Sequence, residues 1–457
     1  MYTKETMLPI LCTILSAVLF YLSFPNCISI VGYWPCIWVF AVPLLIALHE
    51  KPLRQRLGFG ILFGVLAYGL MTQGLFLISP AGYLGFVLAL SIQAVIFAVL
   101  CRYTGKHILD VLYFPCIWAI SELFRNFLLG GFSFNISHAH AFCPLMLKLY
   151  GILGCLGMSF IIFLVNDLIY LAFINKQNRL NFIIAAGIFF WGVVMAGFCI
   201  QNVSLLQGHP LRVAIIQGNI SPSQKASIEL FDRNANIHMR LTQQAYIKAR
   251  PDLVIWPETA FPDDLLQNTQ WRSLIAAQAA RMNADLLVGM APIIDGKEYN
   301  SALLFNHQGL ITGLYNKQSL VPFAETTPFE SWGINWGRGY HFKPGDKPGI
   351  LALSHESLLF GVVICSESAH PLMVRNLKKR GANFLVEMSN DAWFTDKASY
   401  MLHAQAAVMR ALENRMWVIR AANTGISFAV DPNGMIHTDR NLKLGHEGYG
   451  IFDIMIN

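Results

Sequence analysis

The stretch LLFGVVICSES, residues 358–368, decides the fold of the polar half of this chain. It is a continuous apolar run that ends on Cys365, with Ser366 and Glu367 directly after it. Short apolar runs of this kind are typical of strands that are covered on both faces by helices. The end of such a strand holds a side chain on a rigid support, which makes Cys365 a candidate nucleophile.

The cysteine distribution sets Cys365 apart from the others. The chain has nine cysteines, and eight of them lie in the first 200 residues, inside or beside very apolar segments. Cys365 therefore has no disulfide partner in its own half of the chain. The alternative is that it is a buried, unreactive cysteine, which is common in protein cores.

The composition indicates a protein that lies partly in a membrane. Of the 457 residues, 55% are hydrophobic and only 13% are charged, against roughly 25% charged in soluble domains. The net charge of +6 comes without long basic runs, which disfavours nucleic acid as a partner. The apolar residues 8–24 are followed by more apolar segments, so they predict a retained membrane helix and not a cleaved signal peptide.

Residues 1–203 predict a polytopic helical membrane domain, because a spanning helix needs about 20 mainly apolar residues. About seven candidate spans lie at 7–24, 28–48, 57–78, 82–101, 108–128, 149–173 and 181–200. Alternate connections carry Lys and Arg, whereas 25–27, 79–81 and 129–146 contain no charged residue. The positive-inside rule then places the N-terminus in the cytoplasm of a bacterium and everything after residue 200 in the periplasm.

Two ionisable residues lie within the fifth predicted span. Glu122 and Arg125 are three positions apart, so they share a helix face and are each other's expected partner. Arg125 is placed about one turn below the outer surface, where a lipid phosphate could reach it. The alternative, a structural ion pair that closes the helix bundle, is equally open. His138 and His140 follow in the next loop, but they lack a third ligand, so we predict no metal.

From residue 204 onward, short apolar runs alternate with amphipathic segments, which predicts a layered α/β domain over 204–457. Three of these runs end on a reactive side chain, namely Glu258, Lys317 and Cys365. Ligands of α/β proteins collect at strand ends.

These three groups form a coherent chemical set. A carboxylate can take the thiol proton, while an ammonium favours the thiolate and stabilises an oxyanion. The backbone N–H of Ser366 is a second candidate oxyanion donor. Alternatively, Glu258 is a helix cap or loop residue and Lys317 a solvated strand end.

Four segments in order resemble the signatures of the nitrilase superfamily, with the closest fit to its membrane-fused branch, the apolipoprotein N-acyltransferases. They are WPETAFP (256–262), YNKQSLVPFAE (315–325), GVVICSES (361–368) and SNDAWF (389–394). The later run HAQAAVMRALENRMWVIRAANTGIS (403–427) resembles this family as well.

The resemblance implies an α-β-β-α sandwich with a triad of Glu258, Lys317 and Cys365, supported by Glu325 as a second carboxylate and by Glu367 near the nucleophile. It implies acyl transfer from a membrane phospholipid, through a Cys thioester, to the α-amine of the diacylglyceryl-cysteine of lipoproteins. This chemistry needs no metal or organic cofactor. We expect a monomer.

The resemblance also suggests substrate-contacting residues. The helix with Glu122 and Arg125, followed by GGF, is similar to the family's segment beside the lipid entrance. Asn390, Trp393 and Phe394 are expected to line the substrate pocket, with aromatic core packing as the alternative for the last two.

The sequence departs from the family in several places. Ser366 stands where an aromatic residue usually follows the nucleophile, and Ala226 where a tryptophan usually follows the QGNI segment. The loop after GGF reads SFN instead of the usual proline-tryptophan, and no apolar span of an eighth helix follows the catalytic domain.

These departures leave two rivals open. One is a membrane-anchored amidase that uses water, and the other is a lipid-binding paralogue that no longer reacts. The apolar half favours the acyltransferase over the amidase, since a small soluble substrate needs no seven helices.

Overall fold

In a computed structural model, the structure describes residues 4–102, 110–200, 208–225, 227–261, 263–322, 324–326, 341–354, 358–394 and 396–456, together with Asn202 and Leu205. The chain divides into two compact units, Met1–Asn202 with Asp396–Gln405, and Val203–Thr395 with Ala406–Asn457. The division of the sequence at residue 203 stays a prediction, because the first unit also takes in a piece of the later chain.

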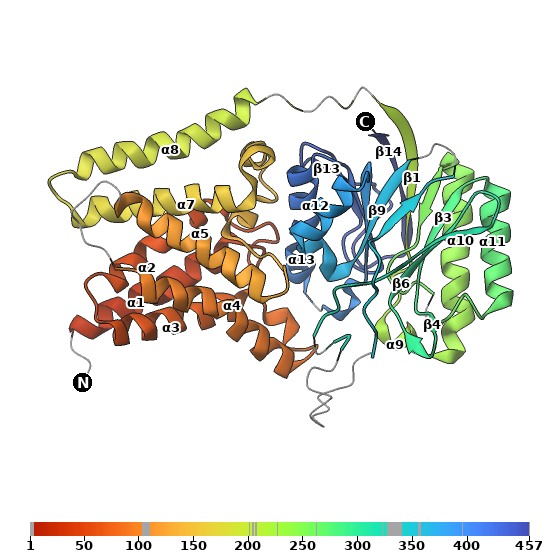
Figure 1. The fold of residues 1–457 in the computed structure, drawn as a ribbon, viewed down its shortest axis with the longest axis horizontal. Coiled ribbons are helices and arrows are strands. Elements are labelled where there is room, and N and C mark those ends of the chain that lie inside the picture. The colour runs from red at the N-terminus through yellow and green to blue at the C-terminus, as the bar shows by residue number, and fades with distance from the viewer. Residues whose placement is uncertain are drawn as a thin grey trace. The chain divides into compact units, whose positions relative to one another are not determined.

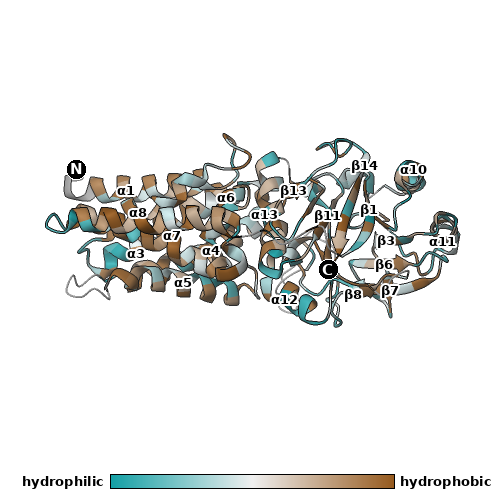
Figure 2. Cartoon of the chain, turned by 90° about the horizontal axis from the view of Figure 1, so that it is seen from above, coloured by the Kyte–Doolittle hydropathy of each residue, from teal (hydrophilic) through white to brown (hydrophobic). Residues whose placement is uncertain are grey.

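The first unit is helical (Figure 1). Its long helices are α1 (Lys4–Ser23), α3 (Leu53–Met71), α4 (Pro80–Leu100), α5 (Asp110–Leu128), α7 (Tyr150–Ile174) and α8 (Arg179–Cys199). The shorter helices are α2 (Ala41–Leu48) and α6 (Pro144–Leu147). Figure 2 shows that apolar residues dominate these helices.

Three helices in the described part of the chain, α4, α7 and α8, are long and apolar enough to cross a membrane. The segments Met7–Ser23 and Trp34–Leu48 are apolar but shorter, so the predicted count of seven spans stays a prediction. The predicted span 28–48 is not one continuous helix. Gly32 adopts φ +79 and a 3-10 segment covers Trp34–Trp38, so the regular helix begins only at Ala41.

The second unit contains two six-stranded sheets. The first has the order β14-β1-β2-β3-β6-β7 and the second the order β13-β12-β11-β10-β9-β8. The first sheet consists of β1 (His209–Gln217), β2 (Leu253–Ile255), β3 (Asp285–Met290), β6 (Ser301–Phe305), β7 (Ile311–Asn316) and β14 (Gly448–Ile456). The second consists of β8 (Ile350–Ala352), β9 (Leu359–Ile364), β10 (Phe384–Ser389), β11 (Val418–Ala422), β12 (Phe428–Val430) and β13 (Ile436–His437). A separate hairpin pairs β4 (Ile293–Ile294) with β5 (Lys297–Glu298).

Helices cover the outer faces of both sheets. One apolar core joins residues of the two sheets, and a second lies between the first sheet and helices α10 (Phe231–Ala249) and α11 (Thr269–Met282). On the second sheet, α12 (Pro371–Lys379) contacts β9, and α13 (Lys397–Asn414) follows β10 in the chain. The unit is thus the predicted α-β-β-α sandwich (Figure 1).

The position of a strand in its sheet explains how apolar its sequence is. β3 and β10 lie inside their sheets and are buried at every residue, so they are mainly apolar and do not alternate with polar residues. β7 is an edge strand and is largely exposed. Both sheets contain parallel neighbours, β1 with β2 and β3 in one, and β9 with β10 and β11 in the other. The carboxyl ends of these parallel strands are where the polar side chains collect.

Candidate active site

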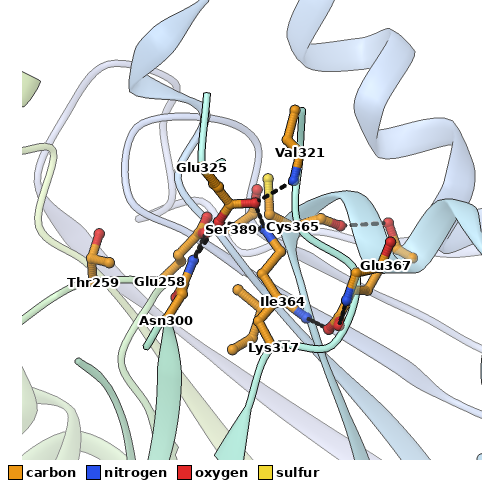
Figure 3. A network of polar contacts seen from close by, with 12 residues as sticks. Glu258, Thr259, Asn300, Lys317, Val321, Glu325, Ile364, Cys365, Glu367 and Ser389 are labelled. Carbon is orange, nitrogen blue, oxygen red and sulfur yellow. Dashed lines mark hydrogen bonds and ion pairs between the residues drawn. The ribbon is translucent and has the colours of Figure 1, made fainter. Parts of the chain in front are cut away.

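The three reactive side chains predicted at strand ends meet in the second unit. Lys317 directly follows β7, Cys365 directly follows β9, and Glu258 comes shortly after β2. The Lys317 ammonium lies 3.7 Å from Glu258 Oε1 and 2.8 Å from Glu325 Oε2. Figure 3 shows the Cys365 side chain among these groups. The carboxylate, ammonium and thiol that the sequence singled out therefore share one site.

Asn300 connects the two carboxylates of the site. Its side-chain amide donates to Glu258 Oε1 at 2.7 Å and to Glu325 Oε1 at 2.9 Å (Figure 3). The backbone carbonyl of Asn300 accepts a hydrogen bond from the backbone N–H of Lys317 at 2.8 Å. Sequence reasoning missed Asn300, because a lone asparagine at the start of an apolar run carries no local signal for this role.

Cys365 adopts a backbone conformation that is unusual for its residue type. Its φ is +55, in the left-handed region that costs a non-glycine residue about 1–3 kcal/mol. The residue opens the 3-10 segment Cys365–Ala369, and as a whole it is neither fully buried nor exposed. Ser366, the second residue of that segment, is partly exposed as well. Cys365 thus lies at a sharp change from strand to 3-10 helix, which is the kind of junction expected for a nucleophile.

The charges of the site leave the thiol protonated and the lysine charged. Burial raises the pKa of the Cys365 thiol and the Glu258 carboxylate adds to this, while Lys317 opposes it. Burial by itself lowers the pKa of Lys317, but Glu325 and Glu258 outweigh it and bring that pKa above its usual value. A base must therefore remove the thiol proton as the sulfur attacks, beside a permanent positive charge.

Glu367 is buried and holds two strand ends together. Its carboxylate accepts the Tyr315 hydroxyl at 2.8 Å and the backbone N–H groups of Gln318, Ser319 and Ile364 at 2.7, 3.0 and 2.8 Å. Burial raises the pKa of Glu367, and Lys317 and these hydrogen bonds oppose the rise. Glu367 thus fixes the segment after β7, which carries Lys317, against the end of β9, which carries Cys365.

A buried charge cluster lies after β10 and was also missed. Arg420 on β11 donates to Asp391 Oδ2 at 2.8 Å and contacts Glu387 on β10. All three side chains are fully buried. The sequence signal was present, since a single arginine inside the run VIRAA and a glutamate inside FLVEMS interrupt apolar strands.

The predicted substrate-contacting residues of this unit differ in exposure. Asn390 is buried and accepts a hydrogen bond from Asn423 at 3.0 Å. Trp393 is 42% exposed, which argues against core packing, and Phe394 is partly buried. Their contact with substrate stays a prediction. Ala226 lies outside the described residues.

Glu122 and Arg125 in α5 are both fully buried, and the hydrogen bonds of each go to other groups, so their pairing with each other stays a prediction. Glu122 accepts the Trp118 indole N–H at 3.1 Å and the backbone N–H of Ile136 at 2.8 Å. Arg125 instead donates to oxygens of Tyr68, Gln93, Asn126, Phe134 and Asn135. The shared helix face explains why both residues are buried, but their partners come from α3, α4, α5 itself and the loop after α5.

Two sheets between helices, with a glutamate, a lysine and a cysteine at the ends of their strands, define a nitrilase-type protein. Residues 212–454 match the carbon-nitrogen hydrolase family, and residues 16–168 match the apolipoprotein N-acyltransferase N-terminal domain. The chain belongs to the carbon-nitrogen hydrolase family, so the resemblance noted from the motifs is confirmed.

Curated relatives match along most of the chain. An apolipoprotein N-acyltransferase of Geobacter metallireducens is 28% identical over 454 residues, 93% of this chain and 86% of the relative. One of Pseudomonas syringae pv. tomato is 27% identical over 88% of this chain and 83% of its own length. Together with the three long apolar helices, these matches identify a membrane protein.

Solved structures similar to part of this chain include two proteins that align with just over half of it. An amidase from Nesterenkonia sp. superposes with a TM-score of 0.43 at 19% identity, over 56% of this chain and 94% of its own. Saccharomyces cerevisiae Nit3, of the nitrilase superfamily, superposes with 0.44 at 18% identity, over 56% and 93%.

Proposed function

We propose that this protein is an apolipoprotein N-acyltransferase that moves a fatty acyl chain from a membrane phospholipid to lipoproteins. The observation that carries the proposal is the site around Cys365, on a chain whose residues 16–168 match the N-terminal domain of these enzymes. An amidase that uses water would need the same site but not that helical domain.

In the first half-reaction, Cys365 attacks the ester carbonyl of the phospholipid. Glu258 takes the thiol proton as the carbon–sulfur bond forms, so that no free thiolate has to persist in the buried site. The Lys317 ammonium and the Ser366 N–H stabilise the negative oxygen of the tetrahedral intermediate. When the carbon–oxygen bond breaks, Glu258 returns the proton to the departing lysophospholipid, which leaves a thioester on Cys365.

In the second half-reaction, the free α-amine of the diacylglyceryl-cysteine attacks the thioester. Glu258 accepts a proton from the amine and then delivers it to the sulfur as the carbon–sulfur bond breaks. The products are an N-acylated lipoprotein and the free thiol of Cys365, which completes a ping-pong cycle.

The remaining polar residues hold this machinery in place. Asn300 and Glu325 orient the Glu258 carboxylate and the Lys317 ammonium through the hydrogen bonds described above. Glu367 fixes the position of the segment with Lys317 relative to the end of the strand that precedes Cys365. Trp393, which is exposed, is the best placed of the predicted pocket residues to contact a lipid chain.

The location follows from the charge of the connections. We place the helices in the bacterial inner membrane with the N-terminus in the cytoplasm and the second unit in the periplasm, because Lys and Arg lie in alternate loops. A monomer suffices, since Glu258, Lys317 and Cys365 all come from one chain.

Intact mass spectrometry tests the proposal. The purified full chain, incubated in detergent micelles with phospholipid and no acceptor, should gain the mass of one acyl group, and Cys365→Ala should gain none. A diacylglyceryl peptide with a free N-terminus should then discharge the adduct into N-acyl peptide. A folded protein that never forms the adduct would refute acyl transfer, and discharge at the same rate in water alone would indicate a hydrolase instead.

A further inference from the structure

Lys225 is a buried lysine near Glu258 for which the mechanism above has no use. It ends the short helix α9 (Pro222–Lys225), and only 8% of it is exposed. Its ammonium donates to the backbone carbonyl of Glu258 at 3.0 Å and to the Thr259 hydroxyl at 3.1 Å. Among the described residues no carboxylate lies within ion-pair distance of the Lys225 ammonium. Its hydrogen-bond acceptors are therefore two uncharged oxygens.

These two oxygens belong to the turn that presents Glu258. Thr259 has φ +45, a left-handed conformation that is strained for a β-branched residue. A strained turn persists only where its surroundings hold it. Lys225 donates hydrogen bonds to both Glu258 and Thr259, so it can stabilise the strained turn.

The same turn also contacts the backbone of β3. The backbone N–H of Phe261 donates to Gly289 at 2.9 Å. A side chain at Gly289 would place its Cβ only 2.1 Å from the Pro257 carbonyl oxygen. The turn is therefore stabilised by contacts with the backbone of β3 and by hydrogen bonds from the Lys225 ammonium.

The segment that carries Lys225 is itself anchored to the second sheet. The backbone N–H of Asn219 donates to the Asn423 carbonyl at 2.8 Å. The Asn423 side chain exchanges hydrogen bonds with the backbone of Ile220 at 3.1 and 2.7 Å. Residues 219–225 thus run as a strap from the end of β11 in one sheet to the Glu258 turn in the other.

The charge of Lys225 changes near neutral pH. Burial lowers the pKa of Lys225 to about 7, and the Glu258 carboxylate opposes this. Among the described residues, His238 on α10 is a further titratable group that interacts with Lys225, and burial lowers the pKa of His238 to about 4, so that it is neutral. Since an ammonium is a stronger donor than a neutral amine, the hold on the turn weakens as the pH rises through about 7.

We propose that Lys225 is a positioning residue, whose hydrogen bonds to Glu258 and Thr259 hold the strained turn so that the Glu258 carboxylate faces Asn300 and Lys317. This inference rests on the proposed acyl transfer through Cys365, with Glu258 as its base. It assigns Lys225 a role in the rate of proton transfer and not in substrate binding.

Single-turnover acylation of the full chain in micelles, between pH 6 and pH 9, tests this role. Lys225→Met should slow thioester formation by about 10- to 100-fold, since small misplacements of a catalytic group cost up to about 10²-fold, and the phospholipid concentration for half-maximal rate should stay unchanged. The Lys225→Arg variant keeps a cation at this position at every pH of the experiment. The wild-type protein loses its cation as the pH rises through about 7, so the ratio of the wild-type rate to the rate of Lys225→Arg should fall over that range.

Two further variants test the positioning role even if an arginine side chain does not fit at position 225. Thr259→Val removes one of the two acceptors, so it should slow acylation less than Lys225→Met and add little to it in the double variant. Gln278→Leu is the matched control, because Gln278 also donates from a buried side chain to a backbone carbonyl, that of Met239 at 2.9 Å, but on α11. It should lower thermal stability and leave the pH profile unchanged.

The outcomes separate the two proposals. A wild-type protein that forms no thioester overturns the acyl transfer itself, and this inference with it. If the wild type forms the thioester, a Lys225→Met variant with wild-type rate and pH profile overturns the positioning role alone. A Lys225→Met variant that behaves like Gln278→Leu, less stable but with an unaltered pH profile, overturns it as well.

Discussion

Replacing Lys317 by methionine should destabilise the second unit, because Glu258 and Glu325 would lose the cation that lies within 4 Å of both. The distances of 2.8 Å to Glu325 and 3.7 Å to Glu258 correspond to attractions of about 6 and about 4 kcal/mol at an effective dielectric constant of about 20. Desolvation of the ammonium offsets much of this. Breaking a buried ion pair from one side costs about 3–5 kcal/mol, which is the loss of unfolding free energy that we expect for Lys317→Met at pH 7.

The loss should shrink as the pH falls. Without Lys317, the Glu258 and Glu325 carboxylates repel each other across the Asn300 amide, so the folded variant binds a proton that the unfolded chain does not. A folded state that binds more protons gains stability as the pH falls. Pulse proteolysis in urea, read from cleavage within residues 209–456, measures the unfolding free energy at pH 5 and pH 8 in detergent micelles.

Lys297→Met is the control, because Lys297 lies in the same unit and is exposed. It should change the unfolding free energy by less than about 0.5 kcal/mol. The reasoning is refuted if Lys317→Met is as stable as the control at pH 8, or if its deficit stays the same at pH 5.

Three other substitutions test other parts of the molecule. Glu258→Gln should leave the fold intact and slow single-turnover thioester formation by about 10²- to 10⁴-fold, the usual contribution of a general base; an unchanged rate would assign the base elsewhere. Gly289→Ala should also slow it, since the new Cβ would lie 2.1 Å from the Pro257 carbonyl oxygen; Gly187→Ala, where a Cβ meets nothing within 4 Å, should not. Arg125→Met should lower the melting temperature of the protein in micelles, because it leaves several buried oxygens without a donor. A variant of normal stability that needs more phospholipid for half-maximal acylation would show instead that Arg125 binds lipid.

The membrane half shows how far helix periodicity leads. The spacing of Glu122 and Arg125 places them on one helix face, and both are indeed buried. Most of their partners nevertheless lie in other segments, such as Ile136 for Glu122 and Gln93 for Arg125. Periodicity reports which residues share a face of their own helix, but it contains no information on which loop folds back over that face.

The sequence by itself determined the division into an apolar and a polar half, the layered α/β class of the polar half and the three reactive residues at strand ends, while the resemblance to the family implied the sandwich. Each of these depends on local order, because apolar runs, their lengths and the residue at which each run stops are properties of neighbouring positions. The tertiary structure alone decided the connections: Asn300 between two carboxylates, Glu367 between two strand ends, and Lys225 under the turn of Glu258. Apart from the bond between Glu367 and Ile364, these contacts join residues that are 25 to 52 positions apart. They exist because the order of strands in the two sheets brings particular strand ends together, and that order follows from how the whole unit packs.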